Sequence, residues 1–97
     1  MSTEEFIIFI YLIIEELYPI VVTKPLRKRG FPPALTDIEI ITMQIVGEFL
    51  KMDTDKSIWM FFKNNYLDWF PKLGSYPNFC KHCANLWQVH QKITAQL

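Results

Sequence analysis

Four segments of this chain pair a helix N-cap signal with apolar residues at helical spacing, and no strand-like alternation runs for more than a few residues. Ser2 with Glu5, and Thr36 with Glu39, have the spacing of capping boxes, in which each side chain bonds the backbone N–H group of the other residue. These signals predict an all-α fold.

The predicted fold is a compact four-helix domain that spans residues 1–97, because one core usually organises about 100 to 150 residues. Pro19 should end the first helix, and Asp53 or Thr54 can cap the third. Pro77 suits the first turn of the fourth helix. We expect the last three helices to form a helix-turn-helix-like arrangement. The helices should cover about residues 2–18, 36–51, 54–65 and 76–96, and a basic connector rich in proline and glycine should cover 23–35.

Gly47 interrupts the apolar sequence of the second predicted helix, on the side of Ile40 and Met43. The missing side chain could let another helix approach closely. The alternative is a tolerated defect that costs about 1 kcal/mol.

The composition supplies a core, since 51% of the residues are hydrophobic and 15% are aromatic. The longest apolar run, Phe6–Ile14, is much shorter than the ~20 residues that cross a bilayer. The chain opens Met-Ser-Thr-Glu-Glu, without the positive segment of a secretory signal. We therefore expect a cytoplasmic protein with no membrane partner.

The first predicted helix is apolar on every side, from Phe6 through Ile14 and again at Leu17. Such a helix should be enclosed by protein, and 97 residues hardly suffice to enclose it. One candidate function is therefore a helical interaction or dimerisation module. In it, the first helix and the aromatic residues Trp59, Trp69 and Phe70 form a homodimer or pack on another domain.

Charge is balanced overall, with ten basic and ten acidic residues, but it is segregated along the chain. Four successive segments, 1–22, 23–33, 34–55 and 56–97, sum to −4, +4, −4 and +4. The first basic segment holds Lys24, Arg27, Lys28 and Arg29. Two basic zones can converge on one polyanion, so the alternative to an ordinary solvated surface is a nucleic-acid interface.

Three clusters could suggest catalytic or metal chemistry. Cys80, Cys83 and His90 supply only three of the four ligands of a tetrahedral zinc site, so packing in the core is the preferred interpretation. Asp53 and Asp55 are explained better as helix caps than as Mg²⁺ ligands. No phosphate-binding glycine loop, nucleophile elbow or HExxH motif occurs, so we expect no enzyme, no cofactor and no bound metal.

The polar face of the fourth predicted helix carries amide and basic side chains, and no acidic residue follows Asp68. Asparagine and glutamine can pair with adenine, and lysine reaches guanine or phosphate. An ordinary wet helix face is the alternative. The DNA-binding hypothesis places Asn78, Lys81, His82, Asn85 and Gln88 at base edges, and Lys72, Ser75, Lys92 and the four basic connector residues at phosphates.

Several blocks of the sequence suggest a family. They are RGFP at 29–32, LTD at 35–37, ITMQIVGEFL at 41–50, DTDK at 53–56, WFPKLGS at 69–75 and ANLW at 84–87. In this order they resemble the N-terminal region of bacterial insertion-sequence transposases of the DDE class, over nearly the whole chain.

The resemblance implies a helical domain that binds double-stranded DNA at the terminal inverted repeats of an insertion element, in the bacterial nucleoid. In that family an RNase H-like catalytic domain follows, with three carboxylates that bind two Mg²⁺ ions. We expect that domain to be absent from this chain, so no catalytic residue is assigned to any position. The expected function is non-catalytic DNA binding in transposition, and a truncated regulator of transposition is a further alternative.

Overall fold

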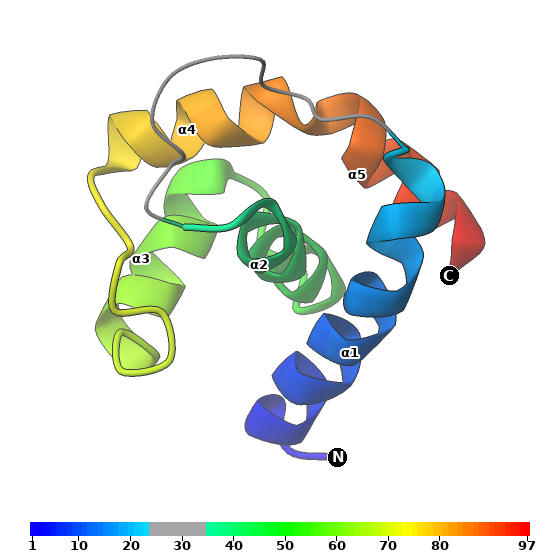
Figure 1. Ribbon diagram of the computed structural model, residues 1–97. Helices are drawn as coiled ribbons and strands as arrows, with labels where there is room; N and C mark the ends of the chain where they lie inside the picture. The colour runs from blue at the N-terminus through cyan, green and yellow to red at the C-terminus, as the bar shows by residue number, and fades with distance from the viewer. Residues whose placement is uncertain (24–34) are drawn as a thin grey trace.

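The computed structural model describes residues 1–23 and 35–97, and within them the chain forms five α-helices and no β-strand (Figure 1). The helices are α1 (Thr3–Val21), α2 (Asp37–Phe49), α3 (Asp55–Asn65), α4 (Tyr76–Asn85) and α5 (Trp87–Gln96). The predicted all-α class is confirmed for these residues. The predicted number of four helices is wrong, because the segment 76–96 forms two helices.

The first four helices begin at hydroxyl side chains that the sequence identifies. The oxygens of Ser2, Thr36, Thr54 and Ser75 each accept a hydrogen bond from the backbone N–H group three residues further on. At Thr36 the capping box is complete, since its own N–H group donates to Oε1 of Glu39 at 3.0 Å. Each cap stabilises its helix by about 1 kcal/mol.

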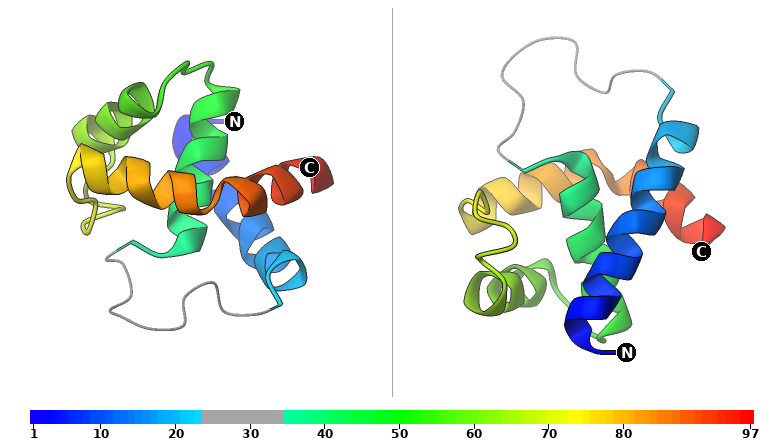
Figure 2. Two further views of the ribbon diagram at one scale, coloured as in Figure 1. Left: turned by 90° about the horizontal axis from the view of Figure 1, so that it is seen from above. Right: turned by 60° about the horizontal axis from the view of Figure 1, so that its bottom comes forward.

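α2 lies at the centre of the fold. Figure 1 looks nearly along this helix, with α1 and α3 on opposite sides and α4 and α5 arching over it; Figure 2 shows the same arrangement from two other directions. α1, α3 and α4 each pack against α2, and α5 packs against α1 and α4. Every residue from Ile40 to Gly47 is buried. The hydrophobic core is therefore built around α2.

Gly47 is a point of close approach between α2 and α3. A Cβ atom at this position would lie 2.5 Å from Cγ1 and 2.7 Å from Cδ1 of Ile58. Real side-chain carbons do not approach so closely. The close approach of another helix at Gly47 is therefore confirmed, and α3 is the helix that makes it.

α1 continues beyond its predicted end, to Val21, with Pro19 inside the helix. Proline lacks the N–H group that would bond the carbonyl of Glu15, but its φ of about −65° is that of a helix. The N–H group of Val22 donates to the carbonyl of Tyr18 at 2.8 Å and closes the last turn. The predicted end at Pro19 is wrong because the proline removes one hydrogen bond without changing the helical φ.

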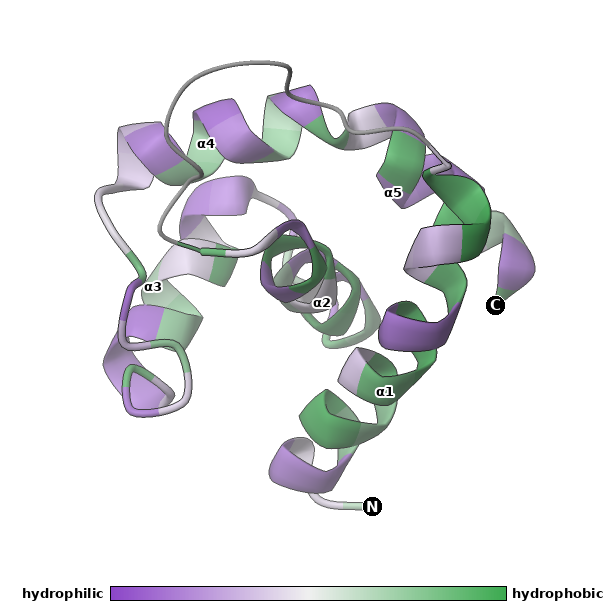
Figure 3. Ribbon diagram, viewed as in Figure 1, coloured by the Kyte–Doolittle hydropathy of each residue, from purple (hydrophilic) through white to green (hydrophobic). Residues whose placement is uncertain are grey.

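The outer side of α1 is not covered by the rest of the chain that the structure describes, and its enclosure by a second protein stays a prediction. Ile7, Ile10 and Ile14 face the core, whereas Ile8 and Leu12 are 50% and 54% exposed. In Figure 3, green hydrophobic segments predominate along α1 and purple hydrophilic segments along α4. Despite this apolar character, none of the helices that the structure describes is long and apolar enough to cross a bilayer.

Candidate nucleic-acid interface

The face of α4 that points away from α2 carries amide and basic side chains. Asn78, Lys81 and Asn85 are exposed and follow each other at spacings of three and four, so they lie along one side of the helix. Phe79 and Cys83 are 3% and 4% exposed and hold the opposite side in the core. Packing of these two residues therefore fixes the direction in which the polar face points.

The segment that leads into α4 brings two more of the predicted residues to the surface. Lys72 and Ser75 are both exposed. The hydroxyl oxygen of Ser75 accepts the N–H group of Asn78 at 3.3 Å, and Pro77 occupies the first turn of α4. The serine hydroxyl hydrogen stays available as a donor, which suits an anion at this end of the helix.

The helix breaks at Leu86, where φ is −109° and ψ is 6°. Leu86 ends α4 and begins α5, and its N–H group bonds the carbonyl of Cys83 at 3.1 Å. Its side chain is 1% exposed, so the break lies against the core. Gln88 and Lys92 are exposed but belong to α5. The face predicted as one straight helix therefore has two segments.

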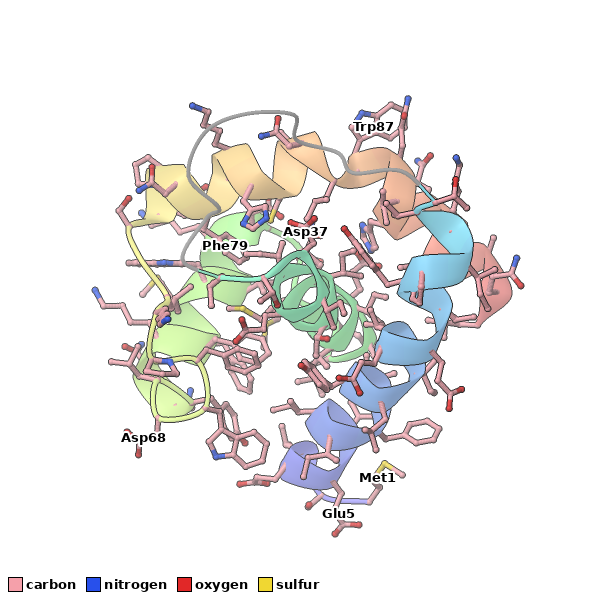
Figure 4. All side chains as sticks on the ribbon, viewed as in Figure 1. Met1, Glu5, Asp37, Asp68, Phe79 and Trp87 are labelled. Carbon is pink, nitrogen blue, oxygen red and sulfur yellow. The ribbon has the colours of Figure 1, made fainter. Side chains whose placement is uncertain are left out.

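His82 does not lie on the exposed face, and this part of the prediction is wrong. Its side chain is buried, and Nε2 lies 2.8 Å from Oδ1 of Asp37 at the start of α2. The hydroxyl of Tyr18 donates to the other oxygen of Asp37 at 2.6 Å. Figure 4 shows Asp37 between α2 and α4. Tyr18, Asp37 and His82 together join α1, α2 and α4, so we remove His82 from the interface.

His90 lies on the core side of α5, and its side chain is mostly buried. Its Nε2 atom lies 2.8 Å from Oε1 of Glu48, an ion-pair distance without the alignment of a hydrogen bond. The second histidine therefore also faces α2 and not the exposed surface.

Trp87 is an exposed residue of this surface that the DNA-binding hypothesis did not include. It is 54% exposed at the first position of α5, beside Gln88, and Figure 4 shows it on the outside of the molecule. The break at Leu86 gives it this prominent position. In the sequence it lies at the edge of the apolar face that Phe79, Cys83, Leu86, His90 and Ile93 form at helical spacing.

Cys83 and Tyr76 of α4 stay uncharged near neutral pH, because the pKa of each is raised. Burial raises the pKa of Cys83 to about 12, with smaller contributions from Asp55 and Cys80. A hydrogen bond with Cys80, burial and neighbouring negative charges raise the pKa of Tyr76. Residues 1–23 and 35–97 contain no group of three His, Cys, Asp or Glu side chains that could hold a metal ion.

The basic connector residues Lys24, Arg27, Lys28 and Arg29 lie outside the described residues. Their predicted contacts with phosphates remain a prediction. The structure thus presents seven of the twelve predicted DNA-binding residues at the surface: Lys72, Ser75, Asn78, Lys81, Asn85, Gln88 and Lys92.

Comparison of the chain with protein-family models, with curated proteins and with solved structures gives no match.

Proposed function

We propose that the exposed side of α4 and α5 binds double-stranded DNA, as the resemblance to the N-terminal region of insertion-sequence transposases suggests. The observation that carries the proposal is the exposure of Asn78, Lys81 and Asn85 on one side of α4, with no acidic residue after Asp68. A carboxylate on this side would repel phosphates, and none from this part of the chain is present.

In this proposal α4 reads bases and its neighbours hold the backbone. Asn78 and Asn85 are seven positions apart, which is about 10 Å along a helix and matches about three base-pair steps. Each amide can form two hydrogen bonds with adenine, and Lys81 between them reaches guanine or a phosphate. Lys72 and Lys92 lie before and after α4 and contact phosphates.

The break at Leu86 limits which residues enter the groove. A single straight helix would carry Gln88 and Lys92 along the same line as Asn85, but α5 starts in a new direction. We therefore propose that α4 alone enters the major groove and that Gln88 and Lys92 contact its edge.

α2 and α3 support α4, in the manner of a helix-turn-helix unit. Both helices pack against α4. The connection from α3 to α4 covers residues 66–75, which is longer than the three- or four-residue turn of that motif. The proposed unit is therefore a variant with an extended connection, and not a tight helix-turn-helix.

Fluorescence anisotropy with a labelled pool of random 25-base-pair duplexes tests the proposal. Neutralisation of about five phosphates predicts a slope of log affinity against log salt of about −4 to −5. Lys81→Ala should flatten this slope by about one unit. The triple variant Arg27→Ala/Lys28→Ala/Arg29→Ala should flatten it by about two to three units if the connector also contacts phosphates.

A matched pair of double variants separates this surface from any other. Lys81→Ala/Asn85→Ala removes a lysine and an asparagine from α4, and Lys56→Ala/Asn64→Ala removes the same two residue types from exposed positions of α3. Only the first should weaken binding and reduce the sequence preference recovered by selection from the random pool. Equal loss in both variants, or no binding at low salt, would overturn the proposal.

A further inference from the structure

The outer face of α1 combines exposed apolar residues with exposed carboxylates at its two ends. We define it by Glu5, Ile8, Phe9, Leu12 and Glu16, all of which are exposed. The three apolar side chains are about half exposed. Their spacing of one, three and four positions places them together on one side of the helix. An apolar patch of this kind with a charged rim is typical of a docking surface.

The charge of this face has one sign. α1 contains four glutamates and no lysine or arginine. In the described part of the chain, the close contacts between a histidine and a carboxylate join His82 to Asp37 and His90 to Glu48, and neither involves a glutamate of α1. Glu5 and Glu16 bracket the apolar residues and are both exposed. Oε1 of Glu5 accepts a hydrogen bond from the neighbouring hydroxyl of Ser2 at 3.2 Å, which leaves the negative charge of this carboxylate at the surface. The face therefore offers a hydrophobic centre between two negative ends.

This charge pattern disfavours a second copy of the chain as the occupant. An antiparallel pairing of two α1 helices around Phe9 and Leu12 would place Glu5 against the partner's Glu16 at both ends. A parallel pairing would place each glutamate against the same glutamate. Like charges at such positions oppose association, so the predicted homodimer through this helix meets repulsion in either direction.

We propose that the outer face of α1 docks a cationic amphipathic helix of another polypeptide. Glu5 and Glu16 are eleven positions apart, or about 16 Å along the helix. A partner helix with basic residues at that separation, and apolar residues between them, would match both the hydrophobic centre and the two negative ends. The same carboxylates would repel an anionic lipid surface. This proposal is independent of the proposed DNA binding.

Binding of two designed peptides tests the proposal. Both are labelled 18-residue helices with leucines at helical spacing between two charged residues eleven positions apart, which are lysines in one peptide and glutamates in the other. The lysine peptide should bind at least tenfold more tightly, and the difference should shrink in high salt. Equal binding of both peptides would overturn the proposal.

Two sets of variants locate the site. Leu12→Ala should weaken binding of the lysine peptide about tenfold, as the loss of a central anchor does. Ile20→Ala, at an exposed apolar position of α1 outside the defined face, should leave it unchanged. Glu5→Lys/Glu16→Lys should reverse the preference between the two peptides. Circular dichroism establishes that each variant is folded, and an unreversed preference in a folded variant would contradict the proposal.

Light scattering and the DNA assay distinguish the remaining outcomes. The protein without peptide should be monomeric, and a dimer that Leu12→Ala dissociates would replace the proposed partner by a second copy. Lys81→Ala/Asn85→Ala should leave peptide binding intact. Loss of DNA binding with intact peptide binding would therefore separate failure of the proposed function from failure of this inference.

Discussion

Nε2 of His82 lies 2.8 Å from Oδ1 of Asp37, and this contact fastens α4 to the first turn of α2. Both side chains are about nine-tenths buried, and Tyr18 binds the second carboxylate oxygen. A cluster of polar side chains from three helices thus lies beneath the surface that we propose binds DNA.

His82→Ala should lower the free energy of unfolding by about 1.5 to 3 kcal/mol. The substitution removes the hydrogen bond between His82 and Oδ1 of the buried Asp37 carboxylate. Urea denaturation measures the change. Lys81→Ala, one position earlier and exposed, is the matched control and should shift stability by less than about 0.5 kcal/mol. Equal stability of the two variants would show that the His82–Asp37 contact contributes nothing.

Gly47→Ala should destabilise the fold, although alanine is the better helix former. Overpacking against Ile58 costs about 1 to 3 kcal/mol, and the gain in helix propensity is about 1 kcal/mol. We expect a net loss of about 1 kcal/mol in thermal or urea unfolding. A stabilised Gly47→Ala variant would mean that α3 can move away at no cost.

Two controls accompany this variant. A Cβ atom at Gly74 would meet nothing within 4 Å, so Gly74→Ala should be close to neutral. In an Ile58→Ala background the clash is gone, and Gly47→Ala should then become neutral or stabilising. If the effects of Gly47→Ala and Ile58→Ala on the free energy of unfolding were strictly additive, the two positions would not interact, contrary to our prediction.

Lys51→Gly should stabilise the end of α2 by about 0.5 to 1 kcal/mol. Lys51 has a φ of 65°, in the left-handed region that favours glycine. Its N–H group bonds the carbonyl of Glu48 at 3.0 Å, and that of Met52 bonds Gly47 at 2.9 Å, which is the Schellman pattern. Lys51→Ala keeps the strain and should give no gain, and a gain of equal size in both variants would assign the effect to the lost charge.

Cys83 should resist alkylation by iodoacetamide at pH 8, while the partly exposed Cys80 reacts first. A pKa of about 12 leaves roughly 10³-fold less thiolate than in an unfolded chain. Because the thiol holds its proton more tightly when folded, stability should fall as the pH rises above about 8.5. Mass spectrometry of the labelled protein measures the alkylation rates of Cys83 and Cys80. A sample unfolded in guanidinium serves as the reference. Equal rates for native and unfolded Cys83 would refute its burial.

The beginnings of α1 to α4 could be predicted because a cap depends on residues only three positions apart. Thr36 with Glu39 is the clearest case, because the structure contains both hydrogen bonds of the predicted capping box. The close approach of another helix at Gly47 could also be predicted, because a missing side chain in a buried helix leaves room for a neighbour. Which helix would approach could not be read from the sequence.

Long-range packing determines the features that the sequence did not reveal. His82 looks polar and exposed on a helical wheel, and its partner Asp37 lies 45 positions away. The break at Leu86 has no proline or glycine to mark it. After the break, α5 packs against α1, while α4 packs against α2 and α3. Phe79 of α4 and Ile93 of α5 are both buried in the core. The exposure of Leu12 likewise depends on which neighbours reach α1.

The packing of α5 against α1 joins the first helix of the chain to the last. During synthesis on a ribosome, the surface of α1 against which α5 packs stays uncovered until residues 87–96 have been made. Until then the nascent polypeptide presents apolar surface of α1 that a chaperone could recognise. Frameshifts that delete α5 should therefore yield a product that is degraded or aggregates, even if they leave the surface of α4 intact.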